Sequence, residues 1–296
     1  MTSQAPFGHM LTAMATAFHE DGSVDLDGTA RIADYLVEHG NDGLVVSGTT
    51  GESPTTSVAE DGEILRAVVG AVGDRAHVVA GVGTNATAHS VELARQAQEA
   101  GADGVLLVSP YYNKPGQGGL LHHFRTVADA SDLPVMLYDV PGRTGTTIEL
   151  ATYAELAGDD RFTSVKDATG LLARTAQLVD LGYAVYSGDD ENTLGYLAYG
   201  AVGLVSVVGH VAGRQLADMI AAFLGGDHAE ALRLHTSLVP VMHAVMGVPN
   251  YGATTAKAGL QLLGVLEHRT VRGPLVALDD AEYAALEAAL QGAGLL

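Results

Sequence analysis

The chain has 296 residues, no cysteine, and 35 acidic against 15 basic side chains, which gives a formal net charge of −20 at pH 7. The lack of cysteine excludes disulfides, thiolate nucleophiles, zinc fingers and iron–sulfur clusters. The acidic surplus argues against nucleic acid or an anionic membrane as a partner, because binding to phosphate groups needs a basic patch.

Neither a targeting segment nor a membrane-spanning segment is recognisable in the sequence. Residues 1–9 contain no basic segment followed by an apolar stretch, so we predict no signal peptide. The most apolar stretch, residues 201–213, is too short to cross a bilayer and is interrupted by Gly203, Gly209 and His210. We therefore expect a cytoplasmic protein.

Short runs rich in Val, Ile, Leu and Met recur along the chain. They are almost continuously apolar rather than alternating, which is typical of parallel strands buried on both faces. The runs are residues 9–18, 43–48, 77–83, 104–110, 134–140, 162–167, 184–188 and 203–208.

Segments with helical periodicity separate these runs. Apolar residues spaced three and four apart predict helices over residues 25–39, 57–72, 87–100 and 120–130. Ser57 followed by Glu60 resembles a capping box at a helix start. Helix ends are predicted near four glycines, Gly40, Gly73, Gly101 and Gly182.

The repeated strand–helix pattern predicts an α/β fold, a TIM (β/α)₈ barrel. A doubly wound open sheet is the alternative, and the pattern alone does not separate the two. Neither a spaced-glycine dinucleotide motif nor a phosphate-binding P-loop occurs. Further helices are predicted over 212–224, 228–246, 254–263 and 280–290. We therefore expect a catalytic barrel over residues 1–224 and a C-terminal helical extension over 225–296 packed on it.

Chemistry in such a barrel takes place where the strands end. Reading the sequence at those positions places hydroxyl, phenol, guanidinium and amine groups at one rim. The residues there are Thr49, Thr50, Tyr111, Tyr112, Tyr138, Arg143, Lys166, Asp167, Gly188, Asp189 and Ser206.

Lys166 is the most informative of these residues, since the chain has only three lysines, Lys114, Lys166 and Lys257. Burial at a strand end lowers the pKa of an amine, and a neutral amine can attack a carbonyl group to form a Schiff base. The alternative is a structural ion pair with Asp167 or Asp189. The other two lysines have no assigned function and are expected to be solvated.

Several neighbours of Lys166 have both a functional and an ordinary interpretation. The Tyr138 phenol could transfer protons, or it could be a core aromatic with a satisfied hydroxyl. The Gly-bounded Thr49-Thr50 turn suits a small carboxylate, although turn chemistry alone explains it as well. Arg143 suits a second carboxylate, or is a surface charge. The Tyr111–Tyr112 pair could line the site, fill a subunit interface, or pack in the core.

Metal-dependent and serine-hydrolase chemistry find no support in the sequence. His122 and His123 are adjacent and therefore point in different directions on a helix, and no HExxH motif or carboxylate triad occurs. The nucleophile-elbow motif GxSxG is also absent. We predict no catalytic metal and no cofactor.

Five segments taken together resemble the dihydrodipicolinate synthase family, which belongs with N-acetylneuraminate lyase among the pyruvate-dependent Schiff-base aldolases. The resemblance covers nearly the whole chain, and five motifs in the right order are far more specific than any one of them. The segments are 48–53 (GTTGES), 110–115 (PYYNKP), 138–145 (YDVPGRTG), 165–170 (VKDATG) and 187–190 (SGDD).

The resemblance implies a homotetramer built from tight dimers and assigns roles to individual residues. Lys166 is the implied Schiff-base lysine, and Tyr138 the implied proton-transferring tyrosine. Tyr138 would be linked through Thr50 to Tyr112 of the partner subunit, with Thr49 beside this relay. Thr50 would also hold the pyruvate carboxylate, the Val205 carbonyl and Gly188 would lie near the substrate, and Arg143 would receive the carboxylate of L-aspartate-4-semialdehyde.

The implied reaction is a lyase-type condensation of pyruvate with L-aspartate-4-semialdehyde. It yields 4-hydroxy-tetrahydrodipicolinate, on the way to diaminopimelate and lysine. The alternative is an aldolase or lyase acting on a keto-deoxy sugar acid or N-acetylneuraminate. Such lyases typically carry Ser-Thr in place of Thr49-Thr50 and usually lack an arginine matching Arg143, so both features favour the synthase. A non-catalytic barrel is a further alternative, but it predicts that Lys166 or Tyr138 would be replaced.

We predict weak or absent feedback inhibition by L-lysine. Family members that lysine inhibits carry histidines and a glutamate around an interface site, and the matching positions here are Val58, Asp61 and His89, although Asn85 and Tyr111 remain. Without the carboxylate that would hold the amino group of lysine, the site loses an attractive partner. A dose–response curve of turnover against L-lysine measures this, and clear inhibition at micromolar lysine would contradict it.

Overall fold

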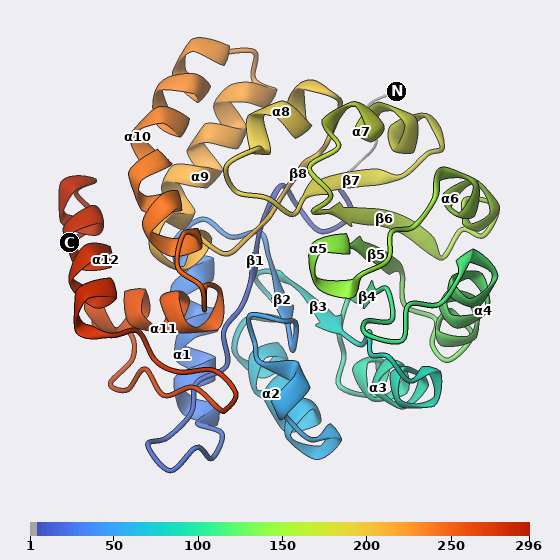
Figure 1. Ribbon diagram of the computed structural model, residues 1–296, viewed down its shortest axis with the longest axis horizontal. Helices are drawn as coiled ribbons and strands as arrows, with labels where there is room; N and C mark the ends of the chain where they lie inside the picture. The colour runs from blue at the N-terminus through green and yellow to red at the C-terminus, as the bar shows by residue number, and fades with distance from the viewer. Residues whose placement is uncertain (1–4) are drawn as a thin grey trace.

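The computed structural model describes residues 5–296 and has at its centre a closed barrel of eight parallel strands, which follow one another in chain order around the barrel (Figure 1). Residues 1–4, part of the segment considered for a signal peptide, lie outside the described residues. Pairing of β1 with β8 closes the sheet, which confirms the barrel and excludes the open sheet. The strands are β1 (Met10–Ala13), β2 (Gly43–Val46), β3 (His77–Gly81), β4 (Gly104–Val108), β5 (Val135–Asp139), β6 (Phe162–Asp167), β7 (Ala184–Ser187) and β8 (Gly203–Ser206).

The apolar character of the strands follows from burial on both of their faces. In β2, Val45 belongs to the cluster that fills the barrel, whereas Leu44 and Val46 belong to the larger cluster between barrel and helices. Phe7 belongs to the inner cluster, and its backbone N–H donates to the Tyr186 hydroxyl at 3.2 Å. A packed interior of this kind leaves the rim at the strand ends as the place for a site.

The helices that cover the barrel begin and end close to the predicted residues. Ser57 caps α2 in a capping box with Glu60, as the sequence predicts. The helices between β5 and β8 are short, which is why periodicity did not reveal them. The outer helices are α1 (Leu26–Glu38), α2 (Val58–Val72), α3 (Thr87–Glu99), α4 (Gln117–Ala128), α5 (Pro141–Thr144), α6 (Leu150–Leu156), α7 (Leu172–Asp180), α8 (Thr193–Ala198) and α9 (Gly209–Leu224), with a 3₁₀ turn at Ser53–Thr55.

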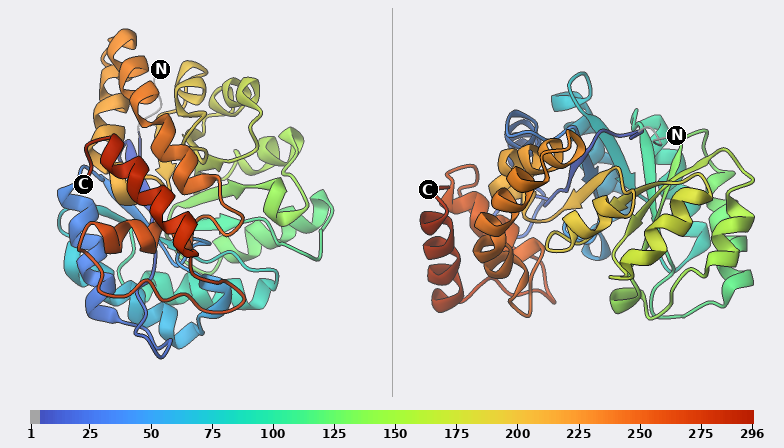
Figure 2. Two further views of the ribbon diagram at one scale, coloured as in Figure 1. Left: turned by 60° about the vertical axis from the view of Figure 1, so that its left-hand side comes forward. Right: turned by 90° about the horizontal axis from the view of Figure 1, so that it is seen from above.

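Three further helices, α10 (His228–Met246), α11 (Ala253–Leu262) and α12 (Asp280–Gly292), form the C-terminal extension. They gather on one side of the barrel (Figure 2), where α10 packs along α9 and α12 packs on α10 and α11. No linker separates α9 from α10, so we keep the division at residues 224 and 225 as a proposal. None of the helices described is long and apolar enough to cross a membrane.

Closure of the barrel depends on close backbone approach at Gly203. A Cβ atom there would lie 2.1 Å from the carbonyl oxygen of His9, next to the β1–β8 pairing. We expect Gly203→Ala to lower the free energy of unfolding by about 1–3 kcal/mol, since backbone must shift to admit the methyl group. Gly70→Ala, at an open helix position of α2, is the matched control and should raise it by roughly 0.5–1 kcal/mol. Urea unfolding of both variants measures this, and equal stability of the two would contradict it.

Candidate active site

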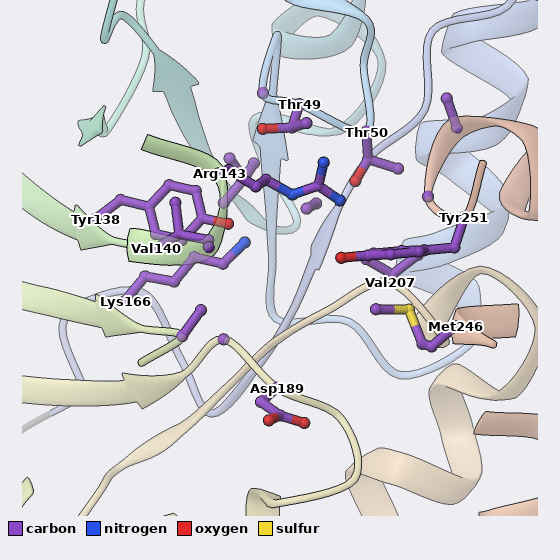
Figure 3. A pocket seen from close by; sticks show the side chains of 18 of the residues that line it. Thr49, Thr50, Tyr138, Val140, Arg143, Lys166, Asp189, Val207, Met246 and Tyr251 are labelled. Atoms are coloured by element: carbon purple, nitrogen blue, oxygen red, sulfur yellow. The ribbon is translucent and has the colours of Figure 1, made fainter. Parts of the chain in front are cut away.

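A cavity of about 430 Å³, here called the rim cavity, opens where the barrel strands end. It brings together seven of the residues that the sequence predicts at the rim, which are Thr49, Thr50, Tyr138, Arg143, Lys166, Gly188 and Asp189. Figure 3 shows Thr50, Tyr138, Arg143 and Lys166 around a common space. Val205 is buried in the barrel interior rather than in the cavity wall. Tyr112 borders a neighbouring cavity of about 290 Å³, the side cavity.

Lys166 projects from the end of β6 and is only 5 % exposed. Burial lowers its pKa to about 8, since the charged amine loses hydration, and the opposing effect of the Asp190 carboxylate is smaller. The proposed structural partners bond elsewhere: Asp167 accepts from Thr169, and Asp189 accepts from Asn192. The site therefore holds an amine that loses its proton more readily than an ordinary lysine.

Tyr138 lies on β5 directly beside Lys166, because the two residues are paired in the strand register. The Lys166 Nζ atom is 4.5 Å from the centre of the Tyr138 ring. Burial raises the pKa of Tyr138 to about 12, so the phenol keeps its proton in the resting site. The next residue, Asp139, anchors the strand end through an ion pair of 2.9 Å with Arg174 of α7. A neutral phenol next to a reactive amine is placed to give and take protons.

Thr49 and Thr50 lie on a tight turn that follows β2. The turn is closed by hydrogen bonds from the Glu52 N–H to the Thr49 carbonyl at 3.1 Å and from the Ser53 N–H to the Gly48 carbonyl at 3.2 Å. Thr49 borders both cavities, whereas Thr50, which is buried, borders the rim cavity and not the side cavity. Of the two threonines, Thr49 shares both cavities with Tyr138.

Gly188 follows β7 and allows the backbone to approach the reactive lysine. A Cβ atom at this position would lie 3.2 Å from Cε of Lys166 and 2.9 Å from Cβ of Ala168. The next strand end is fixed by Asp190, which is buried and accepts from the Ser206 hydroxyl and from the Val207 N–H. A larger residue at position 188 would crowd Ala168 and the end of the Lys166 side chain.

Arg143 comes from the short helix α5 and is the nearest fixed cation to Lys166 in the wall of the rim cavity. Its guanidinium lies 4.9 Å from the ring centre of Tyr251, which belongs to the segment between α10 and α11. The extension contributes further wall residues, and the sequence analysis missed all of them because none lies at a strand end. They are Met246, Tyr251, Gly252, Ala253 and Leu275.

The side cavity adjoins the positions at which we considered lysine inhibition. Asp61 accepts from the Thr56 hydroxyl at 2.7 Å, and burial raises its pKa. His89 Nε2 is buried and makes no hydrogen bond within the described part of the chain. Tyr111, half-buried, lines the cavity with Tyr112. The weak response to lysine stays a prediction.

No group of three or more His, Asp or Glu side chains within residues 5–296 is arranged to hold a metal ion. The rim cavity presents an amine, a phenol, two threonine hydroxyls and a guanidinium group. Such a set can form a covalent adduct with a carbonyl compound and bind carboxylates beside it.

The chain is similar to known proteins of one family. Residues 6–293 match the Dihydrodipicolinate synthetase family. The chain is 57 % identical to the 4-hydroxy-tetrahydrodipicolinate synthase of Acidothermus cellulolyticus over 98 % of the chain and 94 % of that protein. It is 55 % identical to the enzyme of the same name from Kineococcus radiotolerans, with the same coverage.

The chain is also similar to solved structures of dihydrodipicolinate synthases. A dihydrodipicolinate synthase from Bacillus anthracis superimposes with a TM-score of 0.92 at 41 % identity, covering 96 % of this chain and 98 % of that one. The corresponding enzyme of Cyanidioschyzon merolae, solved with lysine bound, has a TM-score of 0.95 at 37 % identity and covers 99 % and 100 % of the two chains.

Proposed function

The chain belongs to the dihydrodipicolinate synthetase family, and on this premise we propose that it condenses pyruvate with L-aspartate-4-semialdehyde to 4-hydroxy-tetrahydrodipicolinate through a Schiff base on Lys166. Lys166 is assigned as the nucleophile because its amine is buried and has a lowered pKa. The neutral phenol of Tyr138 lies beside it, with the ring centre 4.5 Å from Nζ. The enzyme is a lyase of lysine and diaminopimelate biosynthesis. Its relatives are named as synthases, so the sugar-acid aldolase is not favoured.

The reaction starts with attack of neutral Lys166 Nζ on the ketone carbon of pyruvate. Tyr138 supplies the proton with which the oxygen departs as water, leaving an iminium. Loss of a methyl proton then gives an enamine, whose methylene carbon bonds to the aldehyde carbon of the semialdehyde. The amine of the second substrate attacks the iminium carbon, closes the ring and releases Lys166. Only the neutral lysine begins this cycle, which explains the value of a lowered pKa.

Thr49 and Thr50 take different parts in this scheme. The sequence-based expectation linked Tyr138 through Thr50 to Tyr112 of the partner subunit, but Thr49 is the threonine that borders both cavities together with Tyr138, which supports Thr49 for the proton relay. Thr50, which faces the rim cavity, binds the pyruvate carboxylate with its hydroxyl and backbone. Val205 and Gly188 approach pyruvate through their backbones.

Arg143 binds the carboxylate of the semialdehyde. A chain with a net charge of −20 needs such a local cation to attract an anionic substrate, because its overall field repels one. The guanidinium fork lies at the mouth of the rim cavity against the Tyr251 ring, which leaves the carboxylate a defined direction of approach.

We further propose a cytoplasmic homotetramer built from tight dimers, in which Tyr112 completes the relay of a partner subunit. Tyr112 is 89 % exposed in the single chain, and its φ of 72° is costly for a residue other than glycine. A large exposed aromatic held in such a conformation is suited to an interface.

Trapping and turnover test the function. Borohydride added with pyruvate should give a stable adduct on Lys166, with a rate that rises with pH through about 8 and levels off above it, because neutral amine accumulates there. Turnover should occur with L-aspartate-4-semialdehyde rather than by cleavage of keto-deoxy sugar acids. A missing adduct would overturn both enzyme assignments, and cleavage without condensation would favour the sugar-acid aldolase.

Valine substitutions separate the roles of the two threonines, since valine has nearly the shape of threonine. Thr50→Val should raise the KM for pyruvate about 10- to 100-fold, the loss expected for one hydrogen bond to a charged group. Thr49→Val should lower kcat by about 10²- to 10⁴-fold with little change in that KM, as expected for a lost proton-transfer group. Steady-state kinetics with both substrates measures this, and the opposite pattern would exchange the two assignments.

A further inference from the structure

Lys257, on α11, has an environment that contradicts the sequence-based expectation of a solvated lysine. Its side chain is 0 % exposed, and its Nζ donates to Glu52 Oε1 at 2.5 Å and to the Thr270 carbonyl at 2.8 Å. The Nζ atom also lies 4.0 Å from the ring centre of Phe18. The amine is thus buried, paired and unused by the proposed reaction.

The partner, Glu52, ends the turn that carries Thr49 and Thr50. Its carboxylate is buried, and its second oxygen accepts from the backbone N–H of Arg272 at 2.8 Å. Both oxygens are therefore held by the C-terminal extension. Glu52 also has a φ of 60°, a conformation that a residue other than glycine keeps only when its surroundings hold it there.

Arg272 extends this contact along the segment that follows the turn. Its guanidinium donates to the Glu60 carboxylate at 2.6 and 3.1 Å and to the Thr55 carbonyl at 2.9 Å. It also lies 4.5 Å from the ring centre of Phe18, as part of the same cluster as Lys257. The segment from Glu52 to Glu60 is consequently fastened to the extension at several points.

We propose that Lys257 is a positioning residue which, through Glu52, holds the Thr49–Thr50 turn in the geometry needed for pyruvate binding and proton transfer. The roles of the two threonines rest on the proposed function. Besides the two hydrogen bonds that close it, the turn is held by the bonds to the Glu52 carboxylate, and these come from a part of the chain more than two hundred residues away. The C-terminal extension thereby positions the Thr49–Thr50 turn, in addition to lining the rim cavity.

Buried charge makes this contact sensitive to the loss of either partner. A buried carboxylate without its cation either takes up a proton or moves toward water. Because the Glu52 side chain is 1 % exposed, such a movement displaces the backbone of the turn. The neutral pair in Glu52→Gln/Lys257→Met avoids this, since it buries no charge and the glutamine can still accept from the Arg272 N–H.

Kinetics and amide hydrogen exchange of Lys257→Met test the proposal. We expect the KM for pyruvate to rise about 10- to 100-fold, the loss typical of a small misplacement of a binding group, with a lower kcat and little change in the KM for the semialdehyde, which Arg143 binds. Exchange should accelerate over residues 48–55. The Glu52→Gln/Lys257→Met variant should recover a large share of both properties.

Leu260→Ala is the matched control, because Leu260 is equally buried on the same helix but belongs to the apolar core. It should lower thermal stability without changing the KM for pyruvate or the exchange of the turn. Wild-type kinetics of Lys257→Met, or equal effects of both variants on the turn, would overturn the proposal. Where Lys257→Met does not fold, Glu52→Ala/Lys257→Met replaces it, since that variant buries no charge yet frees the turn.

The pH dependence of activity and of hydrogen exchange separates a positioning role of Lys257 from a general loss of stability. In Lys257→Met the Glu52 carboxylate stays buried but loses its ammonium partner, while the Arg272 guanidinium and backbone N–H remain beside it. Burial then favours the protonated carboxyl group at low pH, and the charge returns as the pH rises. Relative to wild type, activity and turn protection should therefore fall with rising pH, and an unchanged ratio would contradict this. The wild-type pyruvate adduct reports separately on the proposed function, whereas turn exchange reports on Lys257 even if no adduct forms.

Discussion

Removal of water from the Lys166 amine is the constraint on which the rest of the site depends. A lysine in water keeps its proton at neutral pH, whereas burial, with a smaller contribution from the Arg143 charge, lowers the pKa of Lys166 to about 8. Closure of the barrel creates that environment, because strands covered on both faces leave the Lys166 side chain only 5 % exposed at the end of β6. The register between β5 and β6 pairs Tyr138 with Lys166 and so places the phenol beside the amine.

Two lysines, Lys166 and Lys257, are buried, and they differ in whether a carboxylate contacts the amine. Lys166 has no carboxylate in direct contact among the described residues, so its burial favours the neutral amine. Burial also lowers the pKa of Lys257 to about 8, but Lys257 Nζ lies 2.5 Å from the Glu52 carboxylate, which opposes this shift and holds the amine in a buried ion pair. One lysine is therefore free to act as a nucleophile, and the other connects the extension to the Thr49–Thr50 turn.

Local sequence patterns were enough to find most of the architecture. The continuous apolar runs identified all eight strands, since burial on both faces removes polar residues from them. Periodicity did not reveal the short helices α5, α6, α7 and α8, because they hold too few turns, although Gly182 correctly marked the end of α7. Likewise, Tyr251 and Met246 lie on no strand end, and their place in the cavity wall depends on how α10 and α11 pack.

The sequence by itself determined the eight strands and which side chains follow their ends, because both are local properties of the chain, and it singled out Lys166 among them. Closure of the sheet into a barrel was decided by the pairing of β1 with β8. Tertiary structure alone decided which carboxylates pair with which cations. Glu52 and Lys257 are 205 residues apart, and no local pattern distinguishes a lysine that will be buried against a distant carboxylate from one in solvent. Packing between distant segments determines how well each charge is solvated, and it therefore decided that Lys257 is buried against Glu52.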